Sequence, residues 1–157
     1  MMKITIAADP GGVELKNVVK KHLLDLGHEV CDKGGEKDAP VLYPVVGDLV
    51  AKDVQSGAAD RGIVFCGTGM GVSIVANKHK GVYCAVVESI FAAYNCREIN
   101  NANMLALGGG LVGTTLGLKI VDTFLNTEWK ADADEARAKR LEGFFAAIRT
   151  VEDEQFR

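Results

Sequence analysis

The chain lacks the features that mark several functional classes. Its 18 Lys and Arg residues are balanced by 21 Asp and Glu residues, for a net charge of −3, and no basic stripe is present. Nucleic acid is therefore not expected as a partner. No apolar run approaches the roughly 20 residues of a membrane span, and residues 1–9 reach an acidic side chain too early for a signal peptide. We expect a cytoplasmic protein that contacts no membrane.

Paired cysteines are also absent. The four cysteines (Cys31, Cys66, Cys84 and Cys96) lie far apart, and none forms a C-x-x-C motif. This spacing offers neither a disulfide framework nor a zinc site, and it is typical of a reduced, cytosolic protein. The three histidines share no metal-ligand spacing, and we expect them on the surface. No metal site is predicted.

The composition predicts one globular domain over residues 1–157. Hydrophobic residues make up 48% of the chain and charged residues 25%, which suffices for a normal core and excludes disorder. Apolar runs alternate with helical periods, which indicates βαβ units and a parallel, doubly wound sheet. Strands are expected over 3–8, 28–31, 61–65, 82–87 and 104–107, and helices over about 45–56, 72–79, 89–98 and 113–126, after a first helix that ends at Gly27.

The C-terminal segment departs from this alternation. Asp132 and Glu135 have the spacing of a capping box, and a sixth helix is expected over about 132–152. Because the sheet is already complete, the apolar face of this helix either packs on its own domain or docks on a second subunit. Two phenylalanines at its centre favour the subunit interface. The face consists of Leu141, Phe144, Phe145, Ile148 and Val151.

The most informative segment is Cys66–Gly71, which reads Cys-Gly-Thr-Gly-Met-Gly between an apolar strand and a helix. A bare glycine loop lets backbone N–H groups converge on an anion, and the helix dipole adds partial positive charge. A thiol at this place is expected to have a lowered pKa and to act as a base or nucleophile. Enediolate chemistry on a small sugar needs both a base for a carbon-bound proton and donors for the resulting oxyanion.

Other candidate residues fall at the carboxyl ends of the predicted strands. Asp9, Glu88 and the run Gly108–Gly110 each follow a strand, as Cys66 does. In doubly wound sheets ligands bind beyond these ends. We therefore expect these residues to converge with the cysteine loop. In contrast, Cys84 lies inside an apolar strand and, like Cys96, is interpreted as a small core residue.

Ten short segments, taken together with their order and spacing, are informative. They are Ala8-Asp9 with Gly11-Gly12, Glu14-Leu15-Lys16, Tyr43-Pro44, Ser56-Gly57-Ala58, Asp60-Arg61-Gly62, Cys66 to Ser73, Ala76-Asn77-Lys78, Gly81-Val82, Asn100 to Asn103 and Leu107-Gly108. With them the chain resembles the ribose-5-phosphate isomerase B and galactose-6-phosphate isomerase family, from Lys3 to about Trp129. The resemblance implies a Rossmann-like three-layer fold with a five-stranded parallel sheet, here followed by the extra C-terminal helix. It also implies a homodimer or homotetramer with active sites at the subunit boundary.

The activity implied by the resemblance is a metal-free, cofactor-free aldose–ketose isomerisation of a phosphorylated sugar through a cis-enediolate. In this reading Cys66 moves the proton between C1 and C2, and Thr68 assists proton movement at the oxygens. Substrate binding falls to the loop glycines and four side chains, namely Gly67, Gly69, Gly71, Asp9, Tyr43, Asn100 and Arg137.

The chain departs from the family pattern at four positions. Pro10 and Ile99 stand where the family usually has histidine, and the second of these histidines opens the furanose ring. Gly110 and Ala133 stand where phosphate-binding arginines are expected, which leaves Arg137. We therefore expect an altered substrate preference.

Three alternatives remain open from the sequence. The glycines 108–110 and the tail around Lys130 look more like the B subunit of galactose-6-phosphate isomerase, so the chain is a candidate partner, even a catalytically weak one, in a hetero-oligomer. A tetrulose phosphate needs no ring opening, which favours a tetrulose-phosphate isomerase. Gly67-x-Gly69-x-Gly71 with Glu88 also allows a nucleotide-binding module. Against this last reading, the loop follows the third strand and no substrate domain remains.

Overall fold

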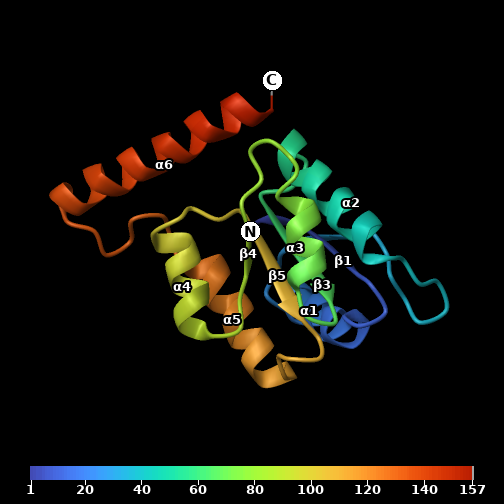
Figure 1. Ribbon diagram of the computed structural model, residues 1–157. Coiled ribbons are helices and arrows are strands. Elements are labelled where there is room, and N and C mark those ends of the chain that lie inside the picture. Colours follow the sequence, from blue (N-terminus) through green and yellow to red (C-terminus); the bar gives the residue numbers. More distant parts are fainter. Residues whose placement is uncertain (157) are drawn as a thin grey trace.

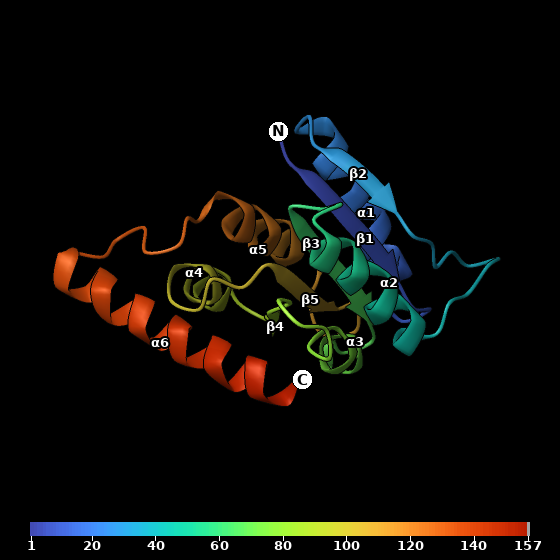
Figure 2. The same ribbon diagram turned by 90° about the horizontal axis from the view of Figure 1, so that it is seen from above.

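The computed structural model describes residues 1–156 and contains a five-stranded parallel sheet between two layers of helices (Figures 1 and 2). The strands are ordered β2-β1-β3-β5-β4. This arrangement confirms the predicted fold. The elements are β1 (Lys3–Ala8), α1 (Val13–Asp25), β2 (Glu29–Asp32), α2 (Tyr43–Ser56), β3 (Arg61–Cys66), α3 (Met70–Ala76), β4 (Cys84–Val86), α4 (Ile90–Glu98), β5 (Met104–Gly108), α5 (Thr114–Asn126) and α6 (Glu135–Gln155).

The strand register brings the ends of three neighbouring strands together. Ala8 of β1 lies opposite Phe65 of β3, and Cys66 of β3 lies opposite Gly108 of β5. Both faces of the central strands are buried, which explains their nearly continuous apolar sequences. The segments that follow β1, β3 and β5 therefore leave the sheet side by side.

Alternate residues of the strands point to opposite faces of the sheet and belong to two separate hydrophobic cores. On one face Ile6 and Phe65 pack with residues from α1, α4 and α5, which form one helical layer. On the other face Val64 and Met104 pack with residues from α2 and α3. This alternation follows from the two-residue period of a strand, and it leaves α6 outside both layers.

Several helix boundaries differ from the sequence predictions. Helix α2 begins at Tyr43, because Pro44 suits the first turn of a helix. Helix α3 ends at Ala76. The expected capping box at Asp132 is wrong: Asp134 caps α6 by accepting from the Arg137 N–H at 2.7 Å, whereas Asp132 accepts a hydrogen bond from the Tyr94 hydroxyl.

Helix α6 crosses the molecule beside α4 and the outer strand β4 (Figures 1 and 2), and its apolar face is divided. Leu141 is buried within the chain, and the Phe145 ring packs against the rings of Tyr83 and Trp129 with centroid distances of 5.2 Å. Phe144 is 58% exposed, and Ile148 and Val151 are also exposed. The expectation that one subunit interface covers the whole face is therefore wrong for Leu141, which its own chain covers, and for the other residues of the face it stays a prediction.

Glu152 attaches the second half of α6 to the body of the molecule. Its carboxylate accepts hydrogen bonds from the Gly81 N–H at 2.5 Å and from the Tyr83 hydroxyl at 3.0 Å. Burial and the Glu152 carboxylate raise the pKa of Tyr83 to about 12, so the hydroxyl remains a donor at neutral pH. None of the helices between residues 1 and 156 has the length and hydrophobicity needed to cross a membrane.

Candidate active site

Cys66 is held at the end of β3 by the loop that follows it. The residue is 5% exposed, and the Gly69 N–H donates to its Sγ at 3.0 Å. Gly69 has a φ of +78°, a left-handed conformation that favours glycine. An N–H donor aimed at the sulfur stabilises negative charge there. The loop geometry therefore suits Cys66 to the role of a residue that accepts a proton.

Glycines allow the three loops at this edge to touch. A Cβ on Gly11 would lie 2.7 Å from the Gly67 N, and one on Gly109 would lie 2.4 Å from the Gly11 carbonyl oxygen. The Gly109 N–H donates to the Cys66 carbonyl at 2.8 Å, and the Gly110 N–H donates to the Gly67 carbonyl at 3.0 Å. The loops after β1, β3 and β5 thus form one rigid unit around the thiol.

Gly67 differs from its neighbours. A Cβ at this position would meet nothing within 4 Å, and its φ lies outside the left-handed region. Neither packing nor backbone conformation within the chain therefore demands glycine here. A bare backbone that faces open space leaves room for a ligand, in keeping with the predicted cradle.

Asp9, Thr68 and Tyr43 surround the same loop. The Asp9 N–H donates to the Phe65 carbonyl at 2.9 Å, and its half-buried carboxylate accepts from the Gly11 N–H at 2.8 Å. Thr68 is exposed beside Cys66. The ring of Tyr43 covers Gly71, where a Cβ would lie 2.8 Å from a ring carbon. The structure brings together Cys66, Gly67, Thr68, Gly69, Gly71, Asp9 and Tyr43.

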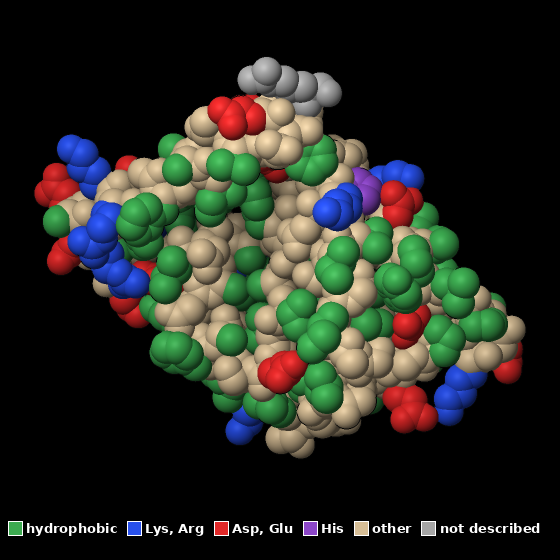
Figure 3. Space-filling model, viewed as in Figure 1, with side chains coloured by type: hydrophobic (Ala, Val, Ile, Leu, Met, Phe, Trp, Pro, Cys, Tyr) green, Lys and Arg blue, Asp and Glu red, His purple; other side chains and the backbone are tan. Residues whose placement is uncertain are grey.

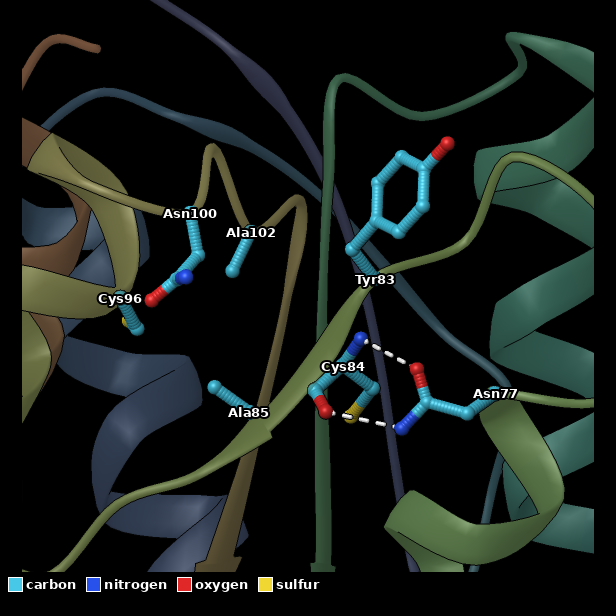
Figure 4. Close-up of a pocket in the computed structure, with 7 residues that line it drawn as sticks. All are labelled: Asn77, Tyr83, Cys84, Ala85, Cys96, Asn100 and Ala102. Atoms are coloured by element: carbon cyan, nitrogen blue, oxygen red, sulfur yellow. Dashed lines mark hydrogen bonds between the residues drawn. The ribbon is translucent and has the colours of Figure 1, made fainter. Parts of the chain in front are cut away.

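Asn100 lies at the opposite edge of the sheet from Cys66, where the strands begin. It follows α4, whose chain direction opposes that of the strands, and the nearby Asn103 carbonyl accepts from the Gly62 N–H at the start of β3. Figure 4 shows its amide facing a cavity of about 240 Å³. The cavity is lined by Asn77, Tyr83, Cys84, Ala85, Cys96, Asn100 and Ala102, and thus by no residue of the Cys66 loop.

Arg137 also lies apart from the thiol. Its Nη2 donates to the Glu98 Oε2 at 2.7 Å, and Glu98 is the last residue of α4, two positions before Asn100. Glu98 is completely buried. Sequence reasoning missed this carboxylate, because it sits at the end of a short helix where the apolar period gives no signal.

Asn77, another residue without a predicted role, binds the outer strand. Its amide nitrogen donates to the Cys84 carbonyl at 2.9 Å, and its amide oxygen accepts from the Cys84 N–H at 2.8 Å (Figure 4). The thiols of the cavity remain protonated, because burial raises the pKa of Cys84 to about 12 and that of Cys96 to about 11. Both cysteines therefore fit the interpretation as core residues.

The sequence led us to expect all three histidines on the surface, but the structure shows that they are partly buried. His22 contacts the Asp122 carboxylate at 2.6 Å, His79 contacts Asp48 at 3.0 Å, and all three histidine rings are partly buried. Each makes a separate structural contact. In the part of the chain that the structure describes, His, Cys, Asp and Glu side chains form no group of three or more that could hold a metal ion.

The parallel sheet with helices on both faces and the glycine loop at the strand ends define a Rossmann-like class of α/β protein, which solved structures match closely. The structure of Clostridium thermocellum ribose-5-phosphate isomerase B superposes with a TM-score of 0.90 and is 42% identical, with 98% of this chain and 99% of that chain covered. The family model described as Ribose/Galactose Isomerase matches residues 4–141. The chain belongs to this family of sugar-phosphate isomerases, enzymes that interconvert aldoses and ketoses.

Two curated relatives indicate the range of the family. The 4-deoxy-4-sulfo-D-erythrose isomerase of Clostridium sp. (strain MSTE9) is 39% identical over 157 residues, which cover 99% of each chain. The galactose-6-phosphate isomerase subunit LacB of Clostridium acetobutylicum is 38% identical over 129 residues, or 82% of this chain and 75% of that protein. With the family established, the nucleotide-binding interpretation is set aside.

Proposed function

We propose that this chain interconverts the aldose and ketose forms of a four-carbon sugar that carries an anionic group at its last carbon. The observation that carries the proposal is Ile99 beside Asn100, together with Pro10 beside Asp9. Neither side chain can move a proton to or from a ring oxygen. A four-carbon substrate substituted at C4 cannot close to a furanose, so it needs no such group. The full-length similarity to an isomerase named for a four-carbon sugar supports this size.

In the proposed reaction Cys66 acts as the base. Its thiolate removes the proton from C2 of the aldose, which gives a cis-enediolate, and returns the proton to C1 to form the ketose. Thr68, exposed beside the thiol, transfers the hydroxyl proton between the two oxygens. The N–H groups of the loop that contains Gly67 stabilise the developing oxyanion.

The site is proposed to be complete only between two copies of the chain. Asn100 and Arg137 lie at the opposite sheet edge from Cys66, so one chain cannot place all three around a small substrate. Exposed apolar side chains support an interface between copies, since Phe91 is 78% exposed and Met70 and Ile74 are also exposed. Figure 3 shows hydrophobic side chains on both sides of a hollow between α6 and the body of the molecule.

The anionic group is proposed to be a phosphate or a sulfonate. The small number of cations expected at the site is the reason to consider the sulfonate beside the phosphate. Gly110 and Ala133 leave Arg137 as the cation expected for this group. A phosphate carries a charge of about −1.5 to −2 at neutral pH, whereas a sulfonate carries one negative charge and needs fewer cations. A relative that matches along nearly its full length is named for a sulfonated substrate.

The test compares kcat/KM for erythrose 4-phosphate, 4-deoxy-4-sulfoerythrose and ribose 5-phosphate with the purified chain. We expect at least one four-carbon substrate to exceed ribose 5-phosphate by about 100-fold or more, which corresponds to roughly 2.7 kcal/mol of transition-state stabilisation. A preference for ribose 5-phosphate would contradict the proposal. Cys66→Ala serves as the inactive control.

The hetero-oligomeric alternative gives a different result in the same assay. Similarity to the LacB subunit motivates it. A chain that is inactive alone on all three substrates, but becomes active on galactose 6-phosphate when a homologous chain is added, would identify it as one subunit of a two-chain enzyme.

A further inference from the structure

Glu98 is a buried carboxylate that the proposed reaction does not use, yet it connects three segments. Its side chain has no exposed surface. Its Oε2 accepts from Arg137 in the first turn of α6, and its backbone carbonyl accepts from the Lys130 N–H at 3.0 Å. Glu98 therefore joins the end of α4 to the start of α6 and to the connection that precedes it.

The other carboxylate oxygen has an unusual environment. Glu98 Oε1 is buried and has no hydrogen-bond partner among the residues that the structure describes. A buried carboxylate with a single cationic partner regains only part of its desolvation cost, and an apolar side chain of similar volume would often be as stable. Packing and stability alone do not explain glutamate at this position.

The neighbouring residues suggest what the carboxylate does. Arg137 is 34% exposed, so its side chain remains accessible to a ligand, and its guanidinium would otherwise sample many rotamers. The bond to Glu98 fixes the guanidinium close to the segment that carries Asn100. Both residues predicted to bind substrate at this edge are thereby held by one short piece of chain.

Two charged groups near Arg137 have partners of their own. The Lys130 ammonium pairs with Glu142, and Asp132 accepts from the Tyr94 hydroxyl. The pair of Glu98 and Arg137 has no net charge. A subsite built on it attracts an anion through directed N–H groups more than through net charge, which lowers the advantage of a dianion over a monoanion.

We infer that Glu98 is a positioning residue for the anion subsite: it fixes the Arg137 guanidinium and offsets its charge, so that the subsite accepts a sulfonate as readily as a phosphate. This inference rests on the proposed function of Arg137. It adds that specificity for the anionic group depends on a residue that does not itself touch the substrate.

A double-mutant cycle tests the positioning role. Glu98→Met removes the acceptor, Arg137→Met removes the guanidinium, and the double variant removes both. We expect each single variant to raise KM by about 10- to 100-fold, the range for a hydrogen bond to a charged group, with kcat changed less than about twofold. The double variant should be no worse than either single one. Effects that multiply, or a loss confined to kcat, would overturn the inference.

Glu98→Gln tests the charge offset and is the variant closest in shape, so it keeps the test available if Glu98→Met does not fold. It retains an oxygen for Arg137 but removes the negative charge. Competitive inhibition by inorganic phosphate should strengthen about threefold or more relative to inhibition by methanesulfonate. Glu154→Gln, on an exposed carboxylate near the C-terminal end of α6 and far along the helix from Arg137, is the matched control and should change neither constant. An unchanged ratio in Glu98→Gln would overturn the charge offset.

Calorimetric binding of inorganic phosphate to the intact oligomer separates this inference from the proposed reaction. The inference holds and the proposed reaction fails under two conditions. The wild-type chain must bind phosphate but turn over none of the sugars, and the effects of Glu98→Met and Arg137→Met on phosphate binding must not multiply in the double variant. If turnover occurs but the two effects on phosphate binding multiply, the reaction stands and Glu98 has only a structural role.

Discussion

The two edges of the sheet are built by different means. At the edge with Cys66, glycine loops touch through backbone atoms, with contacts such as the Gly109 N–H to the Cys66 carbonyl. At the edge with Asn100, side chains make the structure, as Glu98 and Arg137 do across α4 and α6. Backbone contacts between glycines tolerate little variation, whereas side-chain contacts are easily exchanged. The comparison suggests that the first edge holds the proton-transfer chemistry and the second sets the substrate.

The largest effect on kcat is expected from a substitution at the edge that holds Cys66. Cys66→Ala removes the proposed base, and loss of a general base typically lowers kcat by about 10²–10⁴-fold. The fold should survive, because the loop keeps its backbone bonds to the end of β5. Cys84→Ala is the matched control, since this buried thiol is protonated and far from the loop, and it should leave kcat nearly unchanged. Equal losses in both variants, measured by steady-state kinetics, would contradict the assignment.

The next effect tests whether the two edges meet between subunits. Phe144→Asp places a charge on the exposed part of the α6 face, where burying one aromatic ring is worth roughly 1.5–3 kcal/mol per subunit. We expect the oligomer to dissociate and most of the activity to be lost with it. Sedimentation velocity and kinetics on the same sample measure both.

Leu24→Asp is the control for this variant, because Leu24 is also exposed but lies on α1. It should leave the oligomer and the activity intact. A fully active monomer of Phe144→Asp would show that the active site does not depend on the subunit boundary.

A smaller effect sharpens the contrast among the loop glycines. Gly67→Ala should leave the melting temperature unchanged or slightly raised, because a Cβ there meets nothing, yet lower kcat/KM about tenfold by occupying the space of the ligand. Gly109→Ala should instead lower stability by about 1–3 kcal/mol, since its Cβ would collide with the Gly11 carbonyl. Thermal melts and kinetics on both variants decide. Full activity in Gly67→Ala would show that no ligand approaches this backbone.

The smallest effect concerns how α6 is held. The pKa of Tyr83 is raised to about 12, so the stability linked to its protonated form is complete below about pH 10 and is lost as the pH rises toward 12. Tyr83→Phe removes this component, so its unfolding free energy should fall less between pH 10 and 12 than that of the wild type. We expect a difference below about 1 kcal/mol, because the group is partly exposed. Identical pH profiles in urea titrations would contradict the prediction.

The sequence predicted the fold and the grouping of Cys66 with Asp9, but it did not predict the contacts that hold Arg137 and the segment around Asn100. Cys66 and Asp9 could be placed together because parallel strands end at one edge and each residue directly follows a strand. Glu98 and Arg137 are 39 residues apart, and they meet because α6 packs beside α4. A local sequence pattern cannot predict where α6 packs. Phe144 and Phe145 are adjacent in the sequence, but only the second reaches Tyr83, a difference set by tertiary packing.

The contact between Asn77 and Cys84 has a consequence for assembly. β4 is the last strand of the sheet, and Cys84 turns its N–H and carbonyl outward, where another strand would normally pair. The Asn77 amide takes both groups and acts as a substitute for one residue of a sixth strand. The unpaired side of an outer strand is a template for aggregation and for continuous sheets across molecules. Because the Asn77 amide already occupies the Cys84 N–H and carbonyl, the strand of a second molecule cannot pair with β4 at this residue.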